Sequence, residues 1–110
     1  MIELHILIAL VLMHFVADFI FQSDYIAINK SSNSWVLALH VFLYSIPFAY
    51  FGVAFAVVTF VLHFVTDYIS SRVAGNFWKN EQRHWFFVTI GADQAVHMIS
   101  LFAAYAWLVV

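Results

Sequence analysis

The chain of 110 residues contains no cysteine, one proline and very little charge. The absence of cysteine excludes disulfide bonds, zinc sites built from thiolates and catalysis by a thiol. Lysine and arginine together number four, so no basic surface is available for a nucleic acid, and no nucleic acid partner is expected. Only 9% of the residues are charged, which is too few to cover a water-soluble domain of this length.

Most residues of the chain are apolar. Hydrophobic residues make up 65% of the chain and aromatic residues 20%, and the mean hydropathy is +0.95. A transmembrane helix needs about 20 apolar residues, and the second apolar segment is short before Pro47 and is expected to kink there. The sequence predicts one integral membrane domain over residues 1–110, all-α, with four spans. These are expected at about 2–22, 35–50, 52–70 and 85–109.

The basic residues indicate an orientation. All four lie in the first and third connections, and none lies near the termini or in the second turn. By the positive-inside rule, those connections are cytoplasmic and both termini lie outside. We expect a multi-pass protein of a bacterial inner (plasma) membrane, with membrane lipid as its partner. At the cytoplasmic boundary the basic residues are suited to bind an anionic lipid headgroup; they are Lys30, Arg72, Lys79 and Arg83.

The chain contains an internal repeat. Aligning His14 with His63 pairs LMHFVADFI with VLHFVTDYI, so that His, Phe, Val, Asp and Ile recur in register. Two similar helical hairpins in the same orientation form a parallel repeat about an axis along the membrane normal. The predicted fold is therefore a four-transmembrane-helix bundle built from two such hairpins, in which the first and third helices occupy equivalent places.

Ionisable residues recur inside the predicted spans. Pairs four residues apart share one face of a helix, and the pairs in the first and third spans place histidine before aspartate. The fourth span runs in the opposite direction and reverses this order, so all of these residues fall at a similar depth in the cytoplasmic half of the bilayer. They are His14, Asp18, His40, His63, Asp67, Asp93 and His97.

A cation would explain why these residues are tolerated. Each aspartate near a helix centre costs about 2.5–3.5 kcal/mol in membrane insertion, and less near the ends. The spans contain no lysine or arginine partner. Imidazole nitrogen and carboxylate oxygen together form a common ligand set for divalent metals. We therefore predict that the seven residues bind one or two divalent ions, such as zinc, manganese or iron.

Simpler interpretations also fit parts of the pattern. A histidine such as His40 often only bonds two helices together, and each His–Asp pair can be a structural hydrogen bond. His84 lies beside Trp85 at the cytoplasmic boundary and is expected to anchor the chain there. Gln94 is expected to form a hydrogen bond across the bundle.

The motifs resemble those of a family of short bacterial and phage membrane proteins without an assigned function. The resemblance covers essentially the whole chain. It rests on H-x-x-x-D-F-x-x-Q at His14, on H-F-x-x-D-Y-I-x-S-R at His63 and on D-Q-x-x-H at Asp93, together with Lys30 and His40. More remotely, the arrangement is similar to that of membrane-bound metal-dependent hydrolases, which hold metal with intramembrane histidine and aspartate.

These observations favour a metal-dependent hydrolase that acts on a lipid or lipid-linked substrate at the cytoplasmic face. In this interpretation Asp93 and His97 complete the metal site, or one of them acts as a general base. An ion or proton pathway is an alternative, although the polar residues stop in one half of the bilayer and a path would need a homo-oligomer. A haem-binding bundle would gain little from three carboxylates. A non-enzymatic phage or bacterial interaction protein would leave the buried acids without a function.

Overall fold

Every regular element of the protein is a helix, which confirms the all-α prediction. The computed structural model describes residues 1–110. Two short irregular helices, a π-helical turn over Val16–Ile20 and a 3-10 segment over Ile46–Phe51, extend α1 and α3. The five α-helices are α1 (Leu4–Phe15), α2 (Asp24–Asn29), α3 (Ser34–Ser45), α4 (Val53–Lys79) and α5 (Arg83–Leu108).

Three helical segments are long and apolar enough to cross a membrane. They are Ser34–Phe51, Val53–Lys79 and Arg83–Leu108. The first helical segment, Leu4–Ile20, is apolar but shorter. The length and apolar character of these helices are consistent with membrane association.

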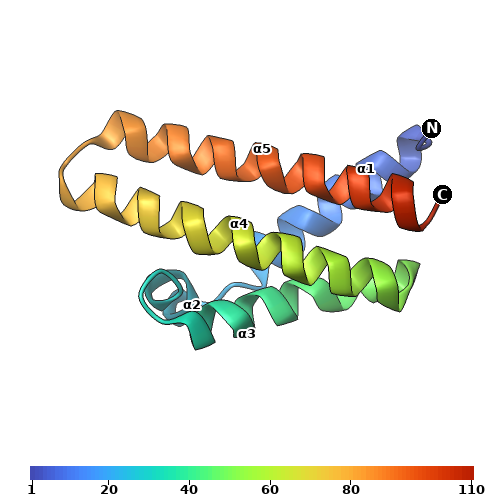
Figure 1. The fold of residues 1–110 in the computed structure, drawn as a ribbon, viewed down its shortest axis with the longest axis horizontal. Helices are drawn as coiled ribbons and strands as arrows, with labels where there is room; N and C mark the ends of the chain where they lie inside the picture. Colours follow the sequence, from blue (N-terminus) through green and yellow to red (C-terminus); the bar gives the residue numbers. More distant parts are fainter.

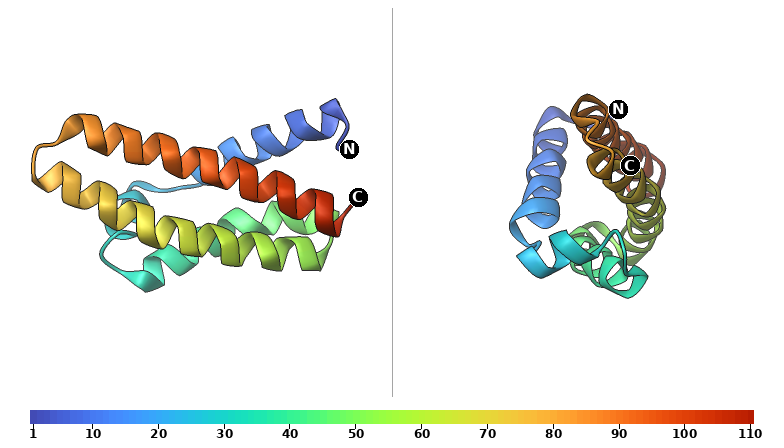
Figure 2. Two further views of the ribbon diagram at one scale, coloured as in Figure 1. Left: turned by 45° about the horizontal axis from the view of Figure 1, so that its top comes forward. Right: turned by 90° about the vertical axis from the view of Figure 1, so that its left-hand side faces the viewer.

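The helices pack side by side along the long axis of the molecule. Figure 1 shows α4 and α5 as an antiparallel hairpin, with α3 packed along α4 and α1 beside α5. Both termini lie at one end of the molecule, and the turn between α4 and α5 lies at the other end, beyond α2. The end-on view in Figure 2 separates α1 from the α4–α5 hairpin, with α2 and α3 across the bottom.

The first helix ends earlier than expected from the apolar run. Regular α-helix stops at Phe15, and the next turn is π-helical, closed by a hydrogen bond of 3.0 Å from Phe21 N to Val16 O. The polar stretch that follows is not only a connection, because it holds α2. Ser23 caps this short helix by accepting a hydrogen bond from Ile26 N.

The second apolar segment stops being regular α-helix close to Pro47, where the sequence predicts a kink. Regular α-helix ends at Ser45, and a 3-10 segment carries Pro47 in its first turn, because proline removes a backbone donor from the helix. The segment ends at Gly52, whose φ of 128° is strained for other residues.

Helix α4 continues through the polar link expected after residue 70. It runs to Lys79, so the connection to α5 is only a short turn. Residues 71–79 contain no proline, and their aromatic side chains pack against α5, which supports the extra turns. Trp78 lies 4.9 Å from Phe86 between ring centroids.

The core has an apolar layer near the termini. Its aromatic rings meet edge-on; Phe55, for example, lies 5.8 Å from Tyr105 between centroids. A layer of buried polar residues lies next to it along the bundle. The apolar layer consists of Leu10, Ala17, Tyr44, Phe48, Phe55, Leu101, Ala104 and Tyr105.

Two glycine substitutions should change stability in opposite directions. Gly52→Ala should lower the free energy of unfolding by about 1 kcal/mol, because alanine is strained at positive φ. Gly75→Ala, inside α4, should raise it by about 0.5–1 kcal/mol, because the added methyl meets no atom within 4 Å. Unfolding in detergent micelles, followed by circular dichroism, measures both. Equal effects at the two positions would contradict this account of the second turn.

Candidate metal centre

The seven ionisable residues singled out in the sequence meet in one buried layer. Each is at most 8% exposed. They come from the first helical segment, α3, α4 and α5, and contacts of 2.9–3.7 Å between histidine nitrogens and carboxylate oxygens connect them all. The structure therefore brings these residues together from four helical segments, as the sequence predicts.

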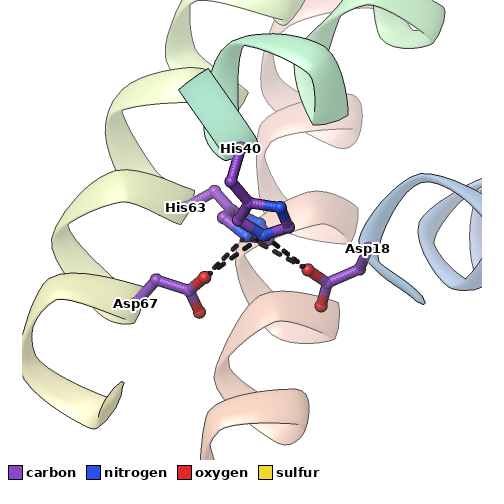
Figure 3. A group of neighbouring side chains, drawn as sticks. All are labelled: Asp18, His40, His63 and Asp67. Atoms are coloured by element: carbon purple, nitrogen blue, oxygen red, sulfur yellow. Dashed lines mark hydrogen bonds and ion pairs between the residues drawn. The ribbon is translucent and has the colours of Figure 1, made fainter. Parts of the chain in front are cut away.

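Four of these residues form a compact group of ligand atoms. His40 Nε2 lies 3.0 Å from Asp18 Oδ1 and 3.4 Å from Asp67 Oδ2. His63 Nε2 lies 3.5 Å and 3.3 Å from the same two oxygens. Figure 3 shows the two carboxylates facing the pair of imidazole rings from opposite sides. We call Asp18, His40, His63 and Asp67 the four-ligand group.

The nitrogen–oxygen distances of the four-ligand group suit a tetrahedral ion. Metal–ligand distances of about 2.0–2.1 Å place neighbouring ligand atoms about 3.3–3.4 Å apart, and the four nitrogen–oxygen distances span 3.0–3.5 Å. All four atoms lie within 4.8 Å of one another. In addition, His63 Nε2 and Asp67 Oδ2 are buried and form no hydrogen bond. The residues present therefore fit a divalent metal.

A second group shares Asp67 with the first. His97 Nε2 lies 2.9 Å from Asp67 Oδ1 and 3.1 Å from Asp93 Oδ1. These three atoms also lie within 4.8 Å of one another. We call Asp67, Asp93 and His97 the three-ligand group. The two groups use different oxygens of one carboxylate.

His14 is placed differently from the other histidines. Its Nε2 lies 2.8 Å from Gln94 Oε1 and its Nδ1 lies 2.7 Å from the Tyr44 hydroxyl, so both ring nitrogens have partners outside the two ligand groups. Gln94 Nε2 in turn donates to Asp93 Oδ2 at 3.0 Å and to Asp18 Oδ2 at 3.4 Å. His14 thus orients Gln94, whose amide nitrogen contacts the Oδ2 atoms of both carboxylates. Gln94 forms the hydrogen bonds across the bundle that the sequence predicts.

One basic residue reaches the polar layer. Lys30 Nζ lies 3.6 Å from Asp67 Oδ2, and the Lys30 side chain is 21% exposed. Lys30 follows α2 and is thus carried from the connection into the bundle.

The other three basic residues form no ion pair with the carboxylates of the polar layer. The Arg72 guanidinium stacks on Tyr68, and the Arg83 guanidinium stacks on Trp78, each 3.7 Å from the ring centroid. Lys79 is exposed in the last turn of α4, about 18 Å along the helix from Asp67. The structure therefore does not bring Lys79 and Arg83 to the polar layer.

Two further residues complete the layer, and neither was expected there from the sequence. Tyr44 follows His40 by four residues, so helical spacing places it on the same face and could have identified it. Ser70 follows Asp67 by three residues, and its hydroxyl donates to Asp93 Oδ1 at 2.5 Å. The contact of Lys30 with Asp67 depends on the path of the α2–α3 connection, and no periodic pattern in the sequence predicts this path.

Removing the Tyr44 hydroxyl should destabilise the protein. Tyr44→Phe leaves the buried Nδ1 of His14 without its partner, which should lower the free energy of unfolding by about 1–3 kcal/mol. Tyr105→Phe is the matched control, because the ring that packs on Phe51 and Phe55 is kept. Unfolding in micelles compares the two variants. The hydrogen-bond assignment is wrong if both variants lose the same amount.

Comparison with known proteins places the chain in a family. The sequence model of the family described as "Protein of unknown function (DUF3307)" matches residues 6–110. No curated protein and no solved structure matches the chain. The match agrees with the resemblance to a family without an assigned function. Because it runs from residue 6 to the last residue, the chain belongs to the DUF3307 family.

Proposed function

We propose that the chain crosses a bacterial inner membrane four times, with both termini outside and the α4–α5 turn in the cytoplasm. The first helical segment, α3 with its 3-10 extension, α4 and α5 are the spans. The common position of the two termini supports an even number of crossings. The basic residues of the first and third connections support the orientation. In this arrangement α1 is a short first span.

The four-ligand group is the proposed site of a divalent ion, with zinc, manganese or iron as candidates. The observation that carries this proposal is the set of four nitrogen–oxygen distances of 3.0–3.5 Å among Asp18, His40, His63 and Asp67. Without an ion, two carboxylates close together in an apolar bundle have only imidazole and one ammonium group to offset their charge. A divalent ion offsets both carboxylates directly.

The proposed activity is hydrolysis of a lipid or lipid-linked substrate. A metal ion in this layer that keeps an open coordination position would supply a nucleophilic hydroxide near neutral pH and would polarise the bond to be broken. Asp93 and His97 lie beside the four-ligand group and are joined to it through Asp67. They are placed to bind metal or to move a proton between water and the leaving group. Water adds to the carbonyl carbon or the phosphorus atom of the ester. The bond from that atom to the leaving oxygen breaks, and the leaving oxygen takes up a proton.

The surroundings of the polar layer support a substrate that arrives from the membrane. A groove of about 350 Å³ runs between α4 and α5, and Ser70 and Asp93 lie in its wall. Most of this wall is apolar. Lys30 is the basic residue nearest to the polar layer and suits an anionic headgroup. Arg72, Lys79 and Arg83 lie nearer the cytoplasmic turn and attract anionic lipid to that face.

A transport function has one feature in its favour. The chain of contacts from Asp18 through His40 and Asp67 to His97 resembles a proton relay. However, the apolar layer of the core, which includes Phe48 and Phe55, closes the bundle on the side of the termini. A relay through one chain therefore ends at this layer, and the hydrolase remains the better-supported function.

The hydrolase proposal predicts a metal-dependent activity. Purified protein in phospholipid vesicles should contain a tightly bound divalent ion and should release water-soluble product from a phospholipid or a lipid-linked diphosphate. A chelator should remove both the ion and the activity. Asp67→Asn should reduce the activity by at least about a hundredfold, because this carboxylate belongs to both groups. Elemental analysis and mass spectrometry of the products provide the two readouts.

The matched control is Asp24→Asn. Asp24 is an exposed aspartate in the first turn of α2, outside the polar layer. This variant should keep both the metal and the activity. An ion-binding protein without hydrolysis across a broad lipid panel would exclude the enzyme and leave the metal site. Metal-free wild-type protein with full stability would exclude the site itself.

The proposed topology can be tested with single cysteines, because the chain has none of its own. Cysteine placed at Asn80, in the α4–α5 turn, should react with a membrane-impermeant maleimide only after cells are opened. Cysteine at Val110 should react in intact spheroplasts. The reverse pattern would show the opposite orientation, and equal labelling from one side would rule out a turn and a terminus on opposite faces.

A further inference from the structure

The polar layer contains more ligand atoms than one tetrahedral ion uses. The four-ligand group takes one oxygen of Asp67, and the other oxygen faces His97 at 2.9 Å. Asp93 Oδ1 lies 3.1 Å from the same histidine nitrogen. Both distances are close to the spacing of about 3.3–3.4 Å between ligands of a tetrahedral ion. The two nitrogen–oxygen distances of the three-ligand group thus suit a second site.

We infer that Asp67, Asp93 and His97 hold a second divalent cation, bridged to the first through Asp67, and that its open position takes a phosphoryl anion. This inference rests on the proposed function, because it presumes an ion in the four-ligand group. A carboxylate that gives one oxygen to each of two ions holds them about 3.5–4 Å apart in two-metal hydrolytic sites.

The number of protein ligands differs between the two groups. Four protein ligands close a tetrahedral site, whereas three leave one position for water or substrate. The second ion is therefore the one that can meet a substrate. Neighbouring side chains hold its ligand Asp93 in place. Ser70 donates to Oδ1 of Asp93, and Gln94 donates to Oδ2.

The charge of the layer indicates the sign of the ligand. Asp18, Asp67 and Asp93 carry three negative charges. Two divalent ions and the Lys30 ammonium carry five positive charges, so with neutral histidines an excess of two positive charges remains. An excess of charge in an apolar bundle is unfavourable unless a ligand offsets it. A phosphate monoester or diester supplies negative charge and oxygen ligands together.

Access to this position runs from the side of the bundle. Asp93 is the member of the three-ligand group that lines the groove between α4 and α5. The groove extends from Val65 to Val73 along α4, about 12 Å. Its polar wall residues are Thr66, Ser70 and Thr89, beside Asp93. A phosphoryl group can reach the second ion either as free phosphate or as the headgroup of a lipid whose chain lies in this groove.

Manganese stoichiometry tests the second site. Full-length protein titrated with Mn²⁺ should bind two ions per chain, and the pair should give an exchange-coupled electron paramagnetic resonance spectrum. Asp93→Asn should bind one ion with an uncoupled spectrum, and the control Glu81→Gln, in the exposed α4–α5 turn, should bind two. Saturation of the wild-type protein at one ion would overturn the inference and leave the proposed metal centre intact. No binding at all would overturn both.

The anion is tested with two probes. Inorganic phosphate, or phosphatidic acid in nanodiscs, should tighten the second Mn²⁺ on the order of tenfold. Ala92→Trp fills the groove wall and should abolish the effect of phosphatidic acid alone, whereas Ala95→Trp, exposed on α5 outside the groove, should change neither effect. A phosphate effect without a phosphatidic acid effect would assign the site to a soluble phosphate. No effect of either probe would overturn the anion assignment.

Discussion

The Asp67 carboxylate is the group on which the rest of the structure depends. It is buried, and both of its oxygens face nitrogen atoms of other residues: His40, His63 and Lys30 face Oδ2, and His97 faces Oδ1. These partners come from α3, α4, α5 and the connection after α2. Leaving one buried charge without its partner typically costs about 3–5 kcal/mol, against a total stability of about 5–15 kcal/mol for a small domain. The packing of the helices and the balance of charge around Asp67 therefore depend on each other.

The irregular turn in the first helix follows from the same requirement. Asp18 lies in the π-helical turn, which supplies the fourth member of the four-ligand group from a helix that packs mainly against α5. Within this turn Asp18 faces His40 at 3.0 Å and His63 at 3.5 Å. His14, one turn earlier, is bonded to Tyr44 and Gln94 instead.

Much of this arrangement could be predicted from the sequence because it depends on period and depth. His63 and Asp67 are four residues apart, and Asp93 and His97 repeat this spacing in the reverse order. This pattern was enough to predict that the polar residues of α4 and α5 lie in one layer. The end of regular α-helix just before Pro47 followed from the missing backbone donor. The features that could not be predicted depend on tertiary contacts, which leave no periodic pattern in the sequence. The extension of α4 beyond residue 70 relies on aromatic packing against α5, and the position of Lys30 relies on the path of a connection.

The separation of the core into two layers limits what the polar residues can do. Tyr44 belongs to both layers: its ring packs 5.1 Å from Phe48, and its hydroxyl bonds His14. Beyond it, on the side of the termini, aromatic and aliphatic side chains dominate the core, and Thr59 adds a buried hydroxyl. The polar layer therefore communicates with solvent or lipid through the Lys30 side and through the groove beside Asp93. A layer that is closed toward the termini and is reached from Lys30 and from the groove suits a site that receives a ligand and returns it to the same face. For a pathway across the membrane, the aromatic layer would have to separate, whereas hydrolysis at one leaflet needs no such motion.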